Sequence, residues 1–161
     1  MIDKILEKIS EAMSINSINF KIREFKIEDY EDAIKIWKDA GLPFKAKGRD
    51  RKSEIEKELK RGCAIFYVGV IEEKVVAVIF GTHDGRKGWI NRVAVASDYK
   101  QKGFAKKLIQ KVEKKLDEMG IEIVAALIED WNKTSMAVFK KLGYIKHDDV
   151  FYFSKRKNPD V

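Results

Sequence analysis

Cysteine, proline and long apolar runs are all scarce in this chain of 161 residues. The single cysteine, Cys63, cannot form a disulfide within the chain, which favours a reducing compartment and predicts a cytoplasmic protein. The longest apolar runs, such as residues 75–80, are far too short to span a bilayer, and the N-terminus lacks the basic-then-apolar order of an export signal. No internal repeat or low-complexity block interrupts the sequence. We therefore expect neither a membrane protein nor an array of repeated modules.

Hydrophobic residues make up 45% of the chain, enough to bury the core of a single domain of this length. The formal net charge is +7 and the pI is about 9.3, which suits nucleic acid, an acidic surface or a multiply phosphorylated cofactor as a partner. The basic residues are spread over the whole chain and interleaved with 26 acidic ones, rather than gathered into a stripe. This distribution makes a nucleic-acid-binding protein, which the net charge and Trp131 would suit, the less favoured alternative.

Apolar periodicity predicts both helices and strands in the first half of the chain. Residues 1–13 are expected to form an amphipathic helix that packs on the body of the protein or on a partner subunit, as in a homodimer. Ser53 is expected to cap a helix over residues 53–60, with Glu56 completing a capping box. The other expected elements are a strand from Phe20 to Arg23, a helix from Tyr30 that ends at Gly41, and strands over residues 64–71, 75–82 and from Trp89 onward. The last three strands are joined by short turns and predict an antiparallel meander.

Residues 89–108 are the most informative stretch, because they join an apolar strand to the start of a helix predicted over residues 103–119. The apolar stripe of that helix consists of Phe104, Leu108, Val112 and Leu116. The first N–H groups of a helix lack internal partners and lie at the positive end of its dipole, so this junction can hold an anion. Gly103 allows close approach of the backbone, and lysines at positions 100, 102, 106 and 107 surround it. An ordinary turn on a lysine-rich surface is the alternative.

A strand over residues 121–128 is expected after this helix, and a crossover of that length sets it parallel to the strand from Trp89. A helix over residues 133–142 and a closing pair of strands, residues 144–147 and 150–154, complete the chain. The predicted fold class is therefore α/β, an α+β arrangement around a mixed sheet.

Two motifs in this sequence resemble those of a known superfamily. Residues 100–105, Lys-Gln-Lys-Gly-Phe-Ala, resemble the Arg/Gln-x-x-Gly-x-Gly/Ala signature of the GNAT superfamily of N-acetyltransferases. Residues 132–144 are similar to the family's Asn-x-x-Ala/Ser-x-x-(apolar)-Tyr-x-Lys-x-Gly-Phe/Tyr helix, and the two motifs occur in the family's order and spacing. The resemblance extends over about residues 19–155. Residues 1–18 are therefore expected to form an N-terminal helical extension and residues 19–161 the GNAT domain.

The resemblance implies the GNAT acyl-CoA N-acyltransferase fold, an antiparallel meander with a splayed parallel strand pair, and acetyl-CoA as cosubstrate with no metal. In this fold the gap between the splayed strands receives the pantetheine arm, which bonds to exposed backbone as an added strand would. The anion-binding junction then holds the pyrophosphate. The implied cofactor-binding residues are Val93, Ala94, Val95, Lys100, Gln101, Lys102, Gly103, Phe104, Ala105, Lys106, Asn132 and Phe139.

The implied reaction is transfer of an acetyl group to a primary amine, in which the neutral amine attacks the thioester directly in a ternary complex. The family's usual glutamate base aligns with Asn91, which cannot accept a proton at neutral pH but could position a water. Glu129, at the carboxyl end of the 121–128 strand, is our first candidate for the base. Asp130, His83 and Asp84 are further candidates, and an ordinary surface or capping role is the alternative for each.

The tyrosine with which many family members protonate the departing thiolate is replaced by Phe139. A thiol has an ordinary pKa of about 8.5 and can leave as thiolate with modest help. Ser135 lies one helical turn earlier and could donate to the sulfur or cap the helix, while Asn132 could both cap the helix and contact pantetheine. The backbone N–H near Val95 is the implied oxyanion donor. The candidate catalytic residues are Glu129, Asn91 and Ser135.

The acceptor is the least determined part of the interpretation, and we expect a small-molecule amine or a peptide or protein amine. The basic residues 44–52 border the acceptor site in this family and favour an acidic acceptor, although a solvated loop is the alternative. Trp131 could wall the amine or pantetheine site, or cover the core. Because Asn91 and Phe139 stand at the usual acid–base positions, a CoA-binding module that has lost catalysis stays open as a second interpretation.

Overall fold

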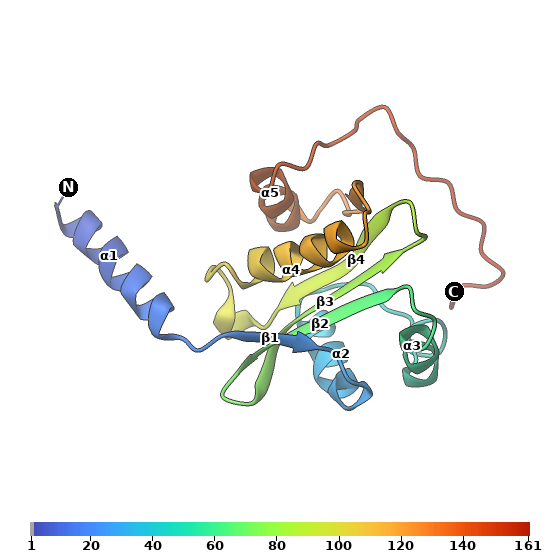
Figure 1. Cartoon of the computed structure of the whole chain (residues 1–161), viewed down its shortest axis with the longest axis horizontal. Helices are drawn as coiled ribbons and strands as arrows, with labels where there is room; N and C mark the ends of the chain where they lie inside the picture. The colour runs from blue at the N-terminus through green and yellow to red at the C-terminus, as the bar shows by residue number, and fades with distance from the viewer. Residues whose placement is uncertain (1) are drawn as a thin grey trace.

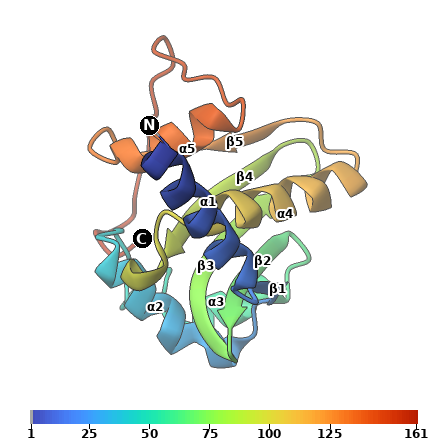
Figure 2. The same cartoon turned by 90° about the vertical axis from the view of Figure 1, so that its left-hand side faces the viewer.

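The computed structural model describes the backbone of residues 2–161 and the side chains of residues 2–10 and 18–161. Its centre is a five-stranded mixed sheet with helices on both faces (Figure 1, Figure 2), which confirms the predicted fold class. The helices are α1 (Ile2–Ser17), α2 (Tyr30–Asp39), α3 (Lys52–Leu59), α4 (Phe104–Glu118) and α5 (Lys133–Lys141), with short 3₁₀ turns at Ile27–Asp29 and Ser97–Tyr99. The strands are β1 (Lys21–Glu24), β2 (Ala64–Ile71), β3 (Lys74–His83), β4 (Gly88–Val95) and β5 (Val124–Ala126).

The sheet has the strand order β1-β2-β3-β4-β5, antiparallel from β1 to β4 and parallel between β4 and β5. Both the predicted meander and the predicted parallel pair are present, and the parallel direction follows from the crossover through α4. β4 and β5 pair over only three positions, Gly88, Trp89 and Ile90 on β4, against Val124–Ala126. The two strands therefore separate after Ile90, where the splay was expected.

Two apolar layers hold the helices to the sheet. On one face, the predicted stripe of α4 is buried, with Phe104, Leu108, Val112 and Leu116 at most 2% exposed. Each such side chain contributes roughly 1.5–3 kcal/mol of burial free energy. On the other face, Trp37 of α2 is fully buried and packs edge-on against Phe80 of β3, with 4.9 Å between ring centroids. The sheet is thus fixed from both sides while the end of β4 stays apart from β5.

The start of α3 differs from the expected capping box. The helix begins at Lys52 rather than Ser53, and its N-cap residue, Arg51, makes no side-chain cap. Instead, the Glu54 carboxylate accepts hydrogen bonds from Arg51 Nη2 and Lys57 Nζ, each at 2.8 Å. A carboxylate in the first turn also interacts favourably with the helix dipole, so this cluster replaces the predicted cap.

The predicted closing strand pair at the C-terminus is wrong. Residues 142–161 form no strand, and the side chains of residues 150–153 are 69–90% exposed. Figure 1 shows this tail leaving α5 and running across to the neighbourhood of α3. There the N–H of Arg49 donates to the Asp160 carbonyl at 3.3 Å, and Arg156 Nη1 donates to the Val161 carbonyl at 3.2 Å. Because its far end is bound to the loop before α3, the tail does not run beside β5.

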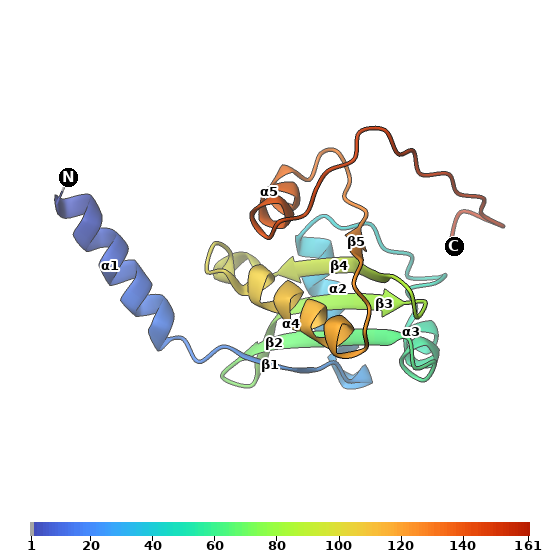
Figure 3. The ribbon, with the colours of Figure 1, turned by 45° about the horizontal axis from the view of Figure 1, so that its top comes forward.

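The N-terminal helix forms as predicted but does not pack on the body of the protein. Figure 3 shows α1 projecting away from the sheet, and its apolar residues are 50–72% exposed: Ile2, Ile5, Leu6 and Ile9. The adjacent sheet face is already covered, because Phe20 stacks on Phe104 of α4 with 4.0 Å between centroids. Met1 and the side chain of Met13 lie outside the described residues. Packing on a partner subunit stays a prediction, and within residues 2–161 no helix is long and apolar enough to cross a bilayer.

Candidate active site

A cavity of about 680 Å³ opens where β4 and β5 separate. Residues from both faces of the sheet line it. From the face of α2 and α3 come Leu42, Arg49, Asp50, Ile55, Glu58, Phe66 and Phe80. From the face of α4 and α5 come Ile90, Val93, Ile128, Asn132, Ser135 and Phe139. The cavity therefore lies at the split in the sheet and is accessible to groups held on either face.

A β-bulge places Asn91 at the point of separation. Phe80 of β3 faces Arg92 and Gly81 faces Ile90, so Asn91 between them has no partner in the ladder. Its side-chain Nδ2 donates to Thr82 Oγ1 at 2.8 Å, which leaves the amide oxygen available. Bulges re-aim side chains at the ends of pairing. Here the bulge directs β4 away from β5 and keeps one polar side chain at the split.

The three predicted catalytic residues are brought together by the fold. Glu129, Asn91 and Ser135 all line the same cavity, although they come from three separate segments. The other proposed bases do not line it. Asp84 accepts hydrogen bonds from the N–H groups of Lys87 and Arg86, which lowers its pKa and commits it to the turn between β3 and β4. Asp130 and His83 also lie outside the described lining of the cavity.

Helix α5 is capped by Asn132 and not by its neighbours. The Oδ1 atom of Asn132 accepts the N–H of Ser135 at 3.1 Å, as the capping expectation for Asn132 required. The alternatives of Asp130 or Ser135 as the cap are wrong, because the Asn132 side chain accepts the capping bond and the backbone N–H of Ser135 donates it. Ser135 therefore keeps its hydroxyl free for another partner. Trp131, which was expected either beside the cavity or over the core, is 53% exposed and outside the cavity lining.

Phe139, which stands where the family pattern has a tyrosine, is one of the residues that line the cavity. It is 4% exposed and packs edge-on against Tyr144, with 4.8 Å between centroids. The hydroxyl of Tyr144 donates to Glu113 Oε1 at 2.7 Å. Burial, together with that carboxylate, raises the pKa of Tyr144 far above its ordinary value. Tyr144 is thus a packing residue, as expected, and its hydroxyl is bound to α4.

The turn before α4 has the geometry of an anion cradle. Gly103 is the N-cap residue with φ of 77°, and Gln101 also has a positive φ of 61°. Among the described backbone and side-chain atoms, which leave out Met1 and the side chains of residues 11–17, no acceptor takes the backbone N–H groups of residues 101–106. A Cβ atom added at Gly103 would meet nothing within 4 Å, so the turn is open above the glycine. Six free donors at a helix N-terminus, with lysines beside them, fit the pyrophosphate of a coenzyme A group. The Phe104 side chain is buried, so only its N–H faces this cradle.

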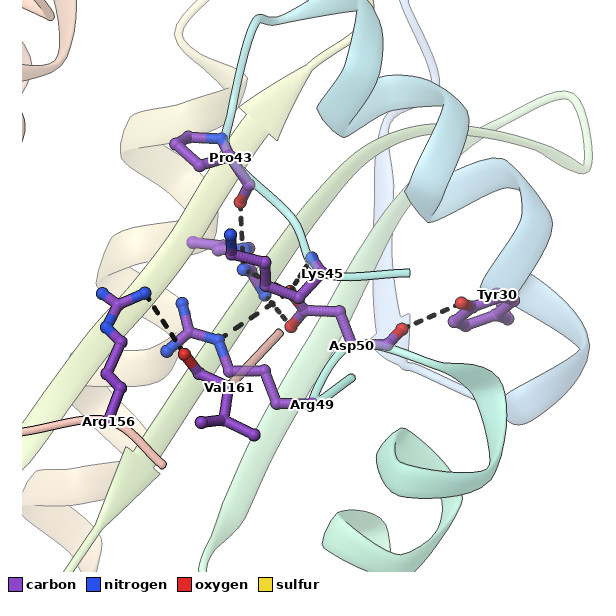
Figure 4. A network of polar contacts seen from close by, with 8 residues as sticks. Tyr30, Pro43, Lys45, Arg49, Asp50, Arg156 and Val161 are labelled. Atoms are coloured by element: carbon purple, nitrogen blue, oxygen red, sulfur yellow. Dashed lines mark hydrogen bonds and ion pairs between the residues drawn. The ribbon is translucent and has the colours of Figure 1, made fainter. Parts of the chain in front are cut away.

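The sequence reasoning missed a buried ion pair on the other side of the cavity (Figure 4). Asp50 is only 3% exposed. Arg92 donates to its carboxylate through Nη1 at 2.6 Å and Nη2 at 2.9 Å, and to the Pro43 carbonyl at 3.1 Å. The N–H of Lys45 donates to Asp50 Oδ2 at 2.6 Å, and the Tyr30 hydroxyl to the Asp50 carbonyl at 2.8 Å. No local pattern predicts this pair, because 42 positions separate its members.

A second missed residue, Glu58, projects into the cavity from α3. It lies one helical turn after the buried Ile55, so the helical spacing could have indicated its inward position. Burial raises the pKa of Glu58, and nearby arginines, chiefly Arg61, partly oppose the shift. Two residues of the basic loop 44–52, Arg49 and Asp50, also line the cavity, while its role at an acceptor site stays a prediction.

Residues 26–144 match the model of the Acetyltransferase (GNAT) family. The chain is 30% identical over 138 residues to Acetyltransferase SG1711 of Sodalis glossinidius (strain morsitans), covering 84% of this chain and 94% of that protein. Its fold is similar to that of the PaiA N-acetyltransferase of Thermoplasma acidophilum in complex with coenzyme A. That match has a TM-score of 0.72 and 20% identity, and it covers 81% of this chain and 92% of the other.

A second solved structure is that of AAC(6')-Iy in complex with the bisubstrate analogue CoA-S-monomethyl-acetylneamine. Its TM-score is 0.68 at 17% identity, and the match covers 86% of this chain and 99% of that one. These structural likenesses show the fold. The family match spans most of the chain, and the curated relative is 30% identical across 84% of it. The chain therefore belongs to the GNAT family of acetyltransferases.

Proposed function

We propose that this acetyltransferase transfers the acetyl group of acetyl-CoA to a primary amine by direct attack in a ternary complex. The observation that carries the proposal is a single cavity lined from both faces of the sheet at the β4–β5 split. A donor held in the split and an acceptor held beside α3 would meet at the same part of β4. Holding two reactants together in this way lowers the entropic cost of a bimolecular step.

The cofactor side of the proposal is supported by two sets of free backbone groups. The N–H groups of residues 101–106 would bind the pyrophosphate, with Lys100, Lys102 and Lys106 adding positive charge. On β4, residues 93–95 pair with β3 on one side and have no β5 partner on the other. The pantetheine arm would bond to that side of β4 as an added strand, and Asn132 and Phe139 would flank it. When bound, the acetyl-CoA supplies the thioester that the amine attacks.

Amine deprotonation is the step for which this chain supplies candidate bases. A primary amine with a pKa near 10 is mostly protonated at neutral pH, so a proton must leave before attack. Glu129 lines the cavity at the β5 side and is our first candidate. Asn91 at the bulge would hold a water between the amine and that carboxylate. Glu58 is the second candidate, and its raised pKa means that its carboxylate form appears at higher pH than that of an ordinary glutamate.

The departing thiolate requires little help, because its conjugate acid has a pKa of about 8.5. Ser135 is our candidate donor in the cavity lining, since its hydroxyl does not serve as the helix cap. The backbone N–H near Val95 would stabilise the oxyanion. The acceptor class that we propose is a small-molecule amine or a peptide or protein amine. The similar fold of AAC(6')-Iy, solved with the bisubstrate analogue CoA-S-monomethyl-acetylneamine, supports the first of these.

The proposal is tested by measuring thiol release from acetyl-CoA against a panel of amines and peptides, followed by pH profiles of Glu129→Gln. With saturating acetyl-CoA, the wild-type rate should rise between about pH 7 and 9. Glu129→Gln should lower the neutral-pH rate by about 10²–10⁴-fold and recover partly at high pH, where free amine is plentiful. Glu122→Gln, an exposed glutamate outside the cavity lining, is the matched control and should behave as wild type.

An unaltered profile in Glu129→Gln would remove that residue as the base, and the same profile measured for Glu58→Gln then decides between Glu58 and a water held by Asn91. Thermal stabilisation by acetyl-CoA without thiol release across the whole panel would contradict the proposed reaction. That outcome would instead indicate a CoA-binding module.

A further inference from the structure

The Arg92–Asp50 ion pair joins the split strand to the loop that walls the acceptor side of the cavity. Arg92 directly follows the Asn91 bulge on β4, and Asp50 ends the loop that leads into α3. The side chains are 13% and 4% exposed, and the contact is bidentate, at 2.6 and 2.9 Å. Such a fork fixes both distance and orientation between the two segments.

Both carboxylate oxygens and the main-chain carbonyl of Asp50 accept hydrogen bonds. Arg92 bonds both carboxylate oxygens, the Lys45 N–H bonds Oδ2, and the Tyr30 hydroxyl bonds the main-chain carbonyl. On its other side, the Arg92 guanidinium lies 4.6 Å from the centroid of the Trp37 ring. The pair thus connects β4, α2 and the loop of residues 43–50 through one buried point.

Movement of this loop would move the cavity wall, because Pro43, Arg49 and Asp50 all line the cavity. Within the loop, the N–H groups of Gly48 and Asp50 donate to the Lys45 carbonyl at 3.0 and 3.1 Å. The turn is therefore closed locally, and Arg92 is what ties it to β4. A buried ion pair contributes little net stability, because the cost of desolvating the two charges offsets most of their attraction. We therefore assign this pair a role in fixing the position of the loop rather than in stabilising the fold.

We propose that Arg92 and Asp50 are positioning residues, which hold the acceptor wall at a fixed place against the acyl-transfer point of β4. The inference rests on the proposed function, because it assigns the α3 side of the cavity to the acceptor. The acceptor amine is therefore placed by a rigid wall rather than by a loop that closes on it. Loss of the fork shifts the wall, and a misplacement of about 1 Å can cost about 100-fold in rate.

The chain contains a matched control for this pair. Arg23 and Asp29 also form a bidentate pair, at 2.7 and 2.8 Å, but these residues do not line the cavity. Replacing arginine by lysine keeps the charge and removes the fork. The comparison of Arg92→Lys with Arg23→Lys therefore separates loss of a bidentate arginine–aspartate contact in general from loss of this buried contact beside the cavity.

The experiment combines amide hydrogen exchange with steady-state kinetics, at a temperature where each variant is folded. Arg92→Lys should lose protection at the amides of Lys45, Gly48 and Asp50, raise the acceptor KM and lower kcat/KM about 10–100-fold, with the Kd of acetyl-CoA within twofold of wild type. Arg23→Lys should keep the wild-type loop protection, acceptor KM, kcat/KM and Kd of acetyl-CoA. Tyr30→Phe, which removes one bond to Asp50 and leaves the ion pair, should show the same changes in smaller measure.

The proposal would be overturned if Arg92→Lys had the same kinetic parameters and the same loop protection as Arg23→Lys. If Arg92→Lys does not fold, unchanged loop protection and acceptor KM in Tyr30→Phe would overturn it equally. The wild-type protein could also acetylate no amine while Arg92→Lys loses loop protection. That combination would support the rigid wall and contradict the proposed function.

Discussion

Replacing Gly103 by valine separates the anion cradle from the fold that carries it. Gly103 and Gly120 flank the two ends of α4 with nearly equal φ values, 77° and 73°. An added Cβ meets nothing within 4 Å at either glycine, so each substitution costs only backbone strain. A side chain held in this conformation costs about 1–3 kcal/mol. In a domain of this size each kcal/mol lowers Tm by about 2–4 °C, so both variants should melt about 2–12 °C below wild type.

The two variants should differ only when acetyl-CoA is added. At about 100 times its Kd, a ligand that binds the folded state stabilises it by about 2.7 kcal/mol, a rise of about 5–11 °C in Tm. Wild type and Gly120→Val should both show this rise by differential scanning fluorimetry. Gly103→Val should show none, because its side chain and distorted turn block the approach of the phosphate oxygens. An undiminished rise in Gly103→Val would place the pyrophosphate elsewhere.

Two further predictions concern the α5 end of the cavity. If departure of the thiolate limits turnover, Phe139→Tyr should raise the single-turnover rate by up to about 10²–10⁴-fold, because it adds a general acid to the cavity lining. The Kd of acetyl-CoA should stay unchanged. An unaltered rate would mean that the thiolate leaves unaided or that Ser135 already donates. Tyr144→Phe should lower the free energy of unfolding by about 1–2 kcal/mol in thermal or urea denaturation, because it breaks the bond of 2.7 Å to the Glu113 carboxylate. An equally stable Tyr144→Phe protein would show that water replaces this bond at no cost.

The regular part of the fold could be predicted because its signals are local. The stripe from Phe104 to Leu116 repeats with the period of a helix, and the length of that helix sets β4 and β5 parallel. The free N–H groups at Gly103 follow from helix geometry alone. These features need no knowledge of where distant residues lie.

The parts that could not be predicted depend on long-range contacts. Residues 144–154 carry strand-forming side chains, but a strand also needs a partner edge, and the tail is bound near Arg49 instead. The Arg92–Asp50 pair consists of two charged residues that look solvent-exposed in the sequence. Only the fold shows that they meet. Glu58 lies between these cases, because its spacing from Ile55 was visible but its cavity was not.

The split between β4 and β5 has a consequence for the order of substrate addition. In the proposed reaction, acetyl-CoA enters from the α4 face and the amine from the α3 face, so neither closes the path of the other. Initial-velocity lines at several fixed amine concentrations should then intersect, as in a sequential scheme with both substrates bound before chemistry. Free CoA, as product, competes with acetyl-CoA while leaving the amine route open. Because β4 and β5 pair at only three positions, the proposed reaction has two separate routes, and each product should compete with the substrate that uses the same route.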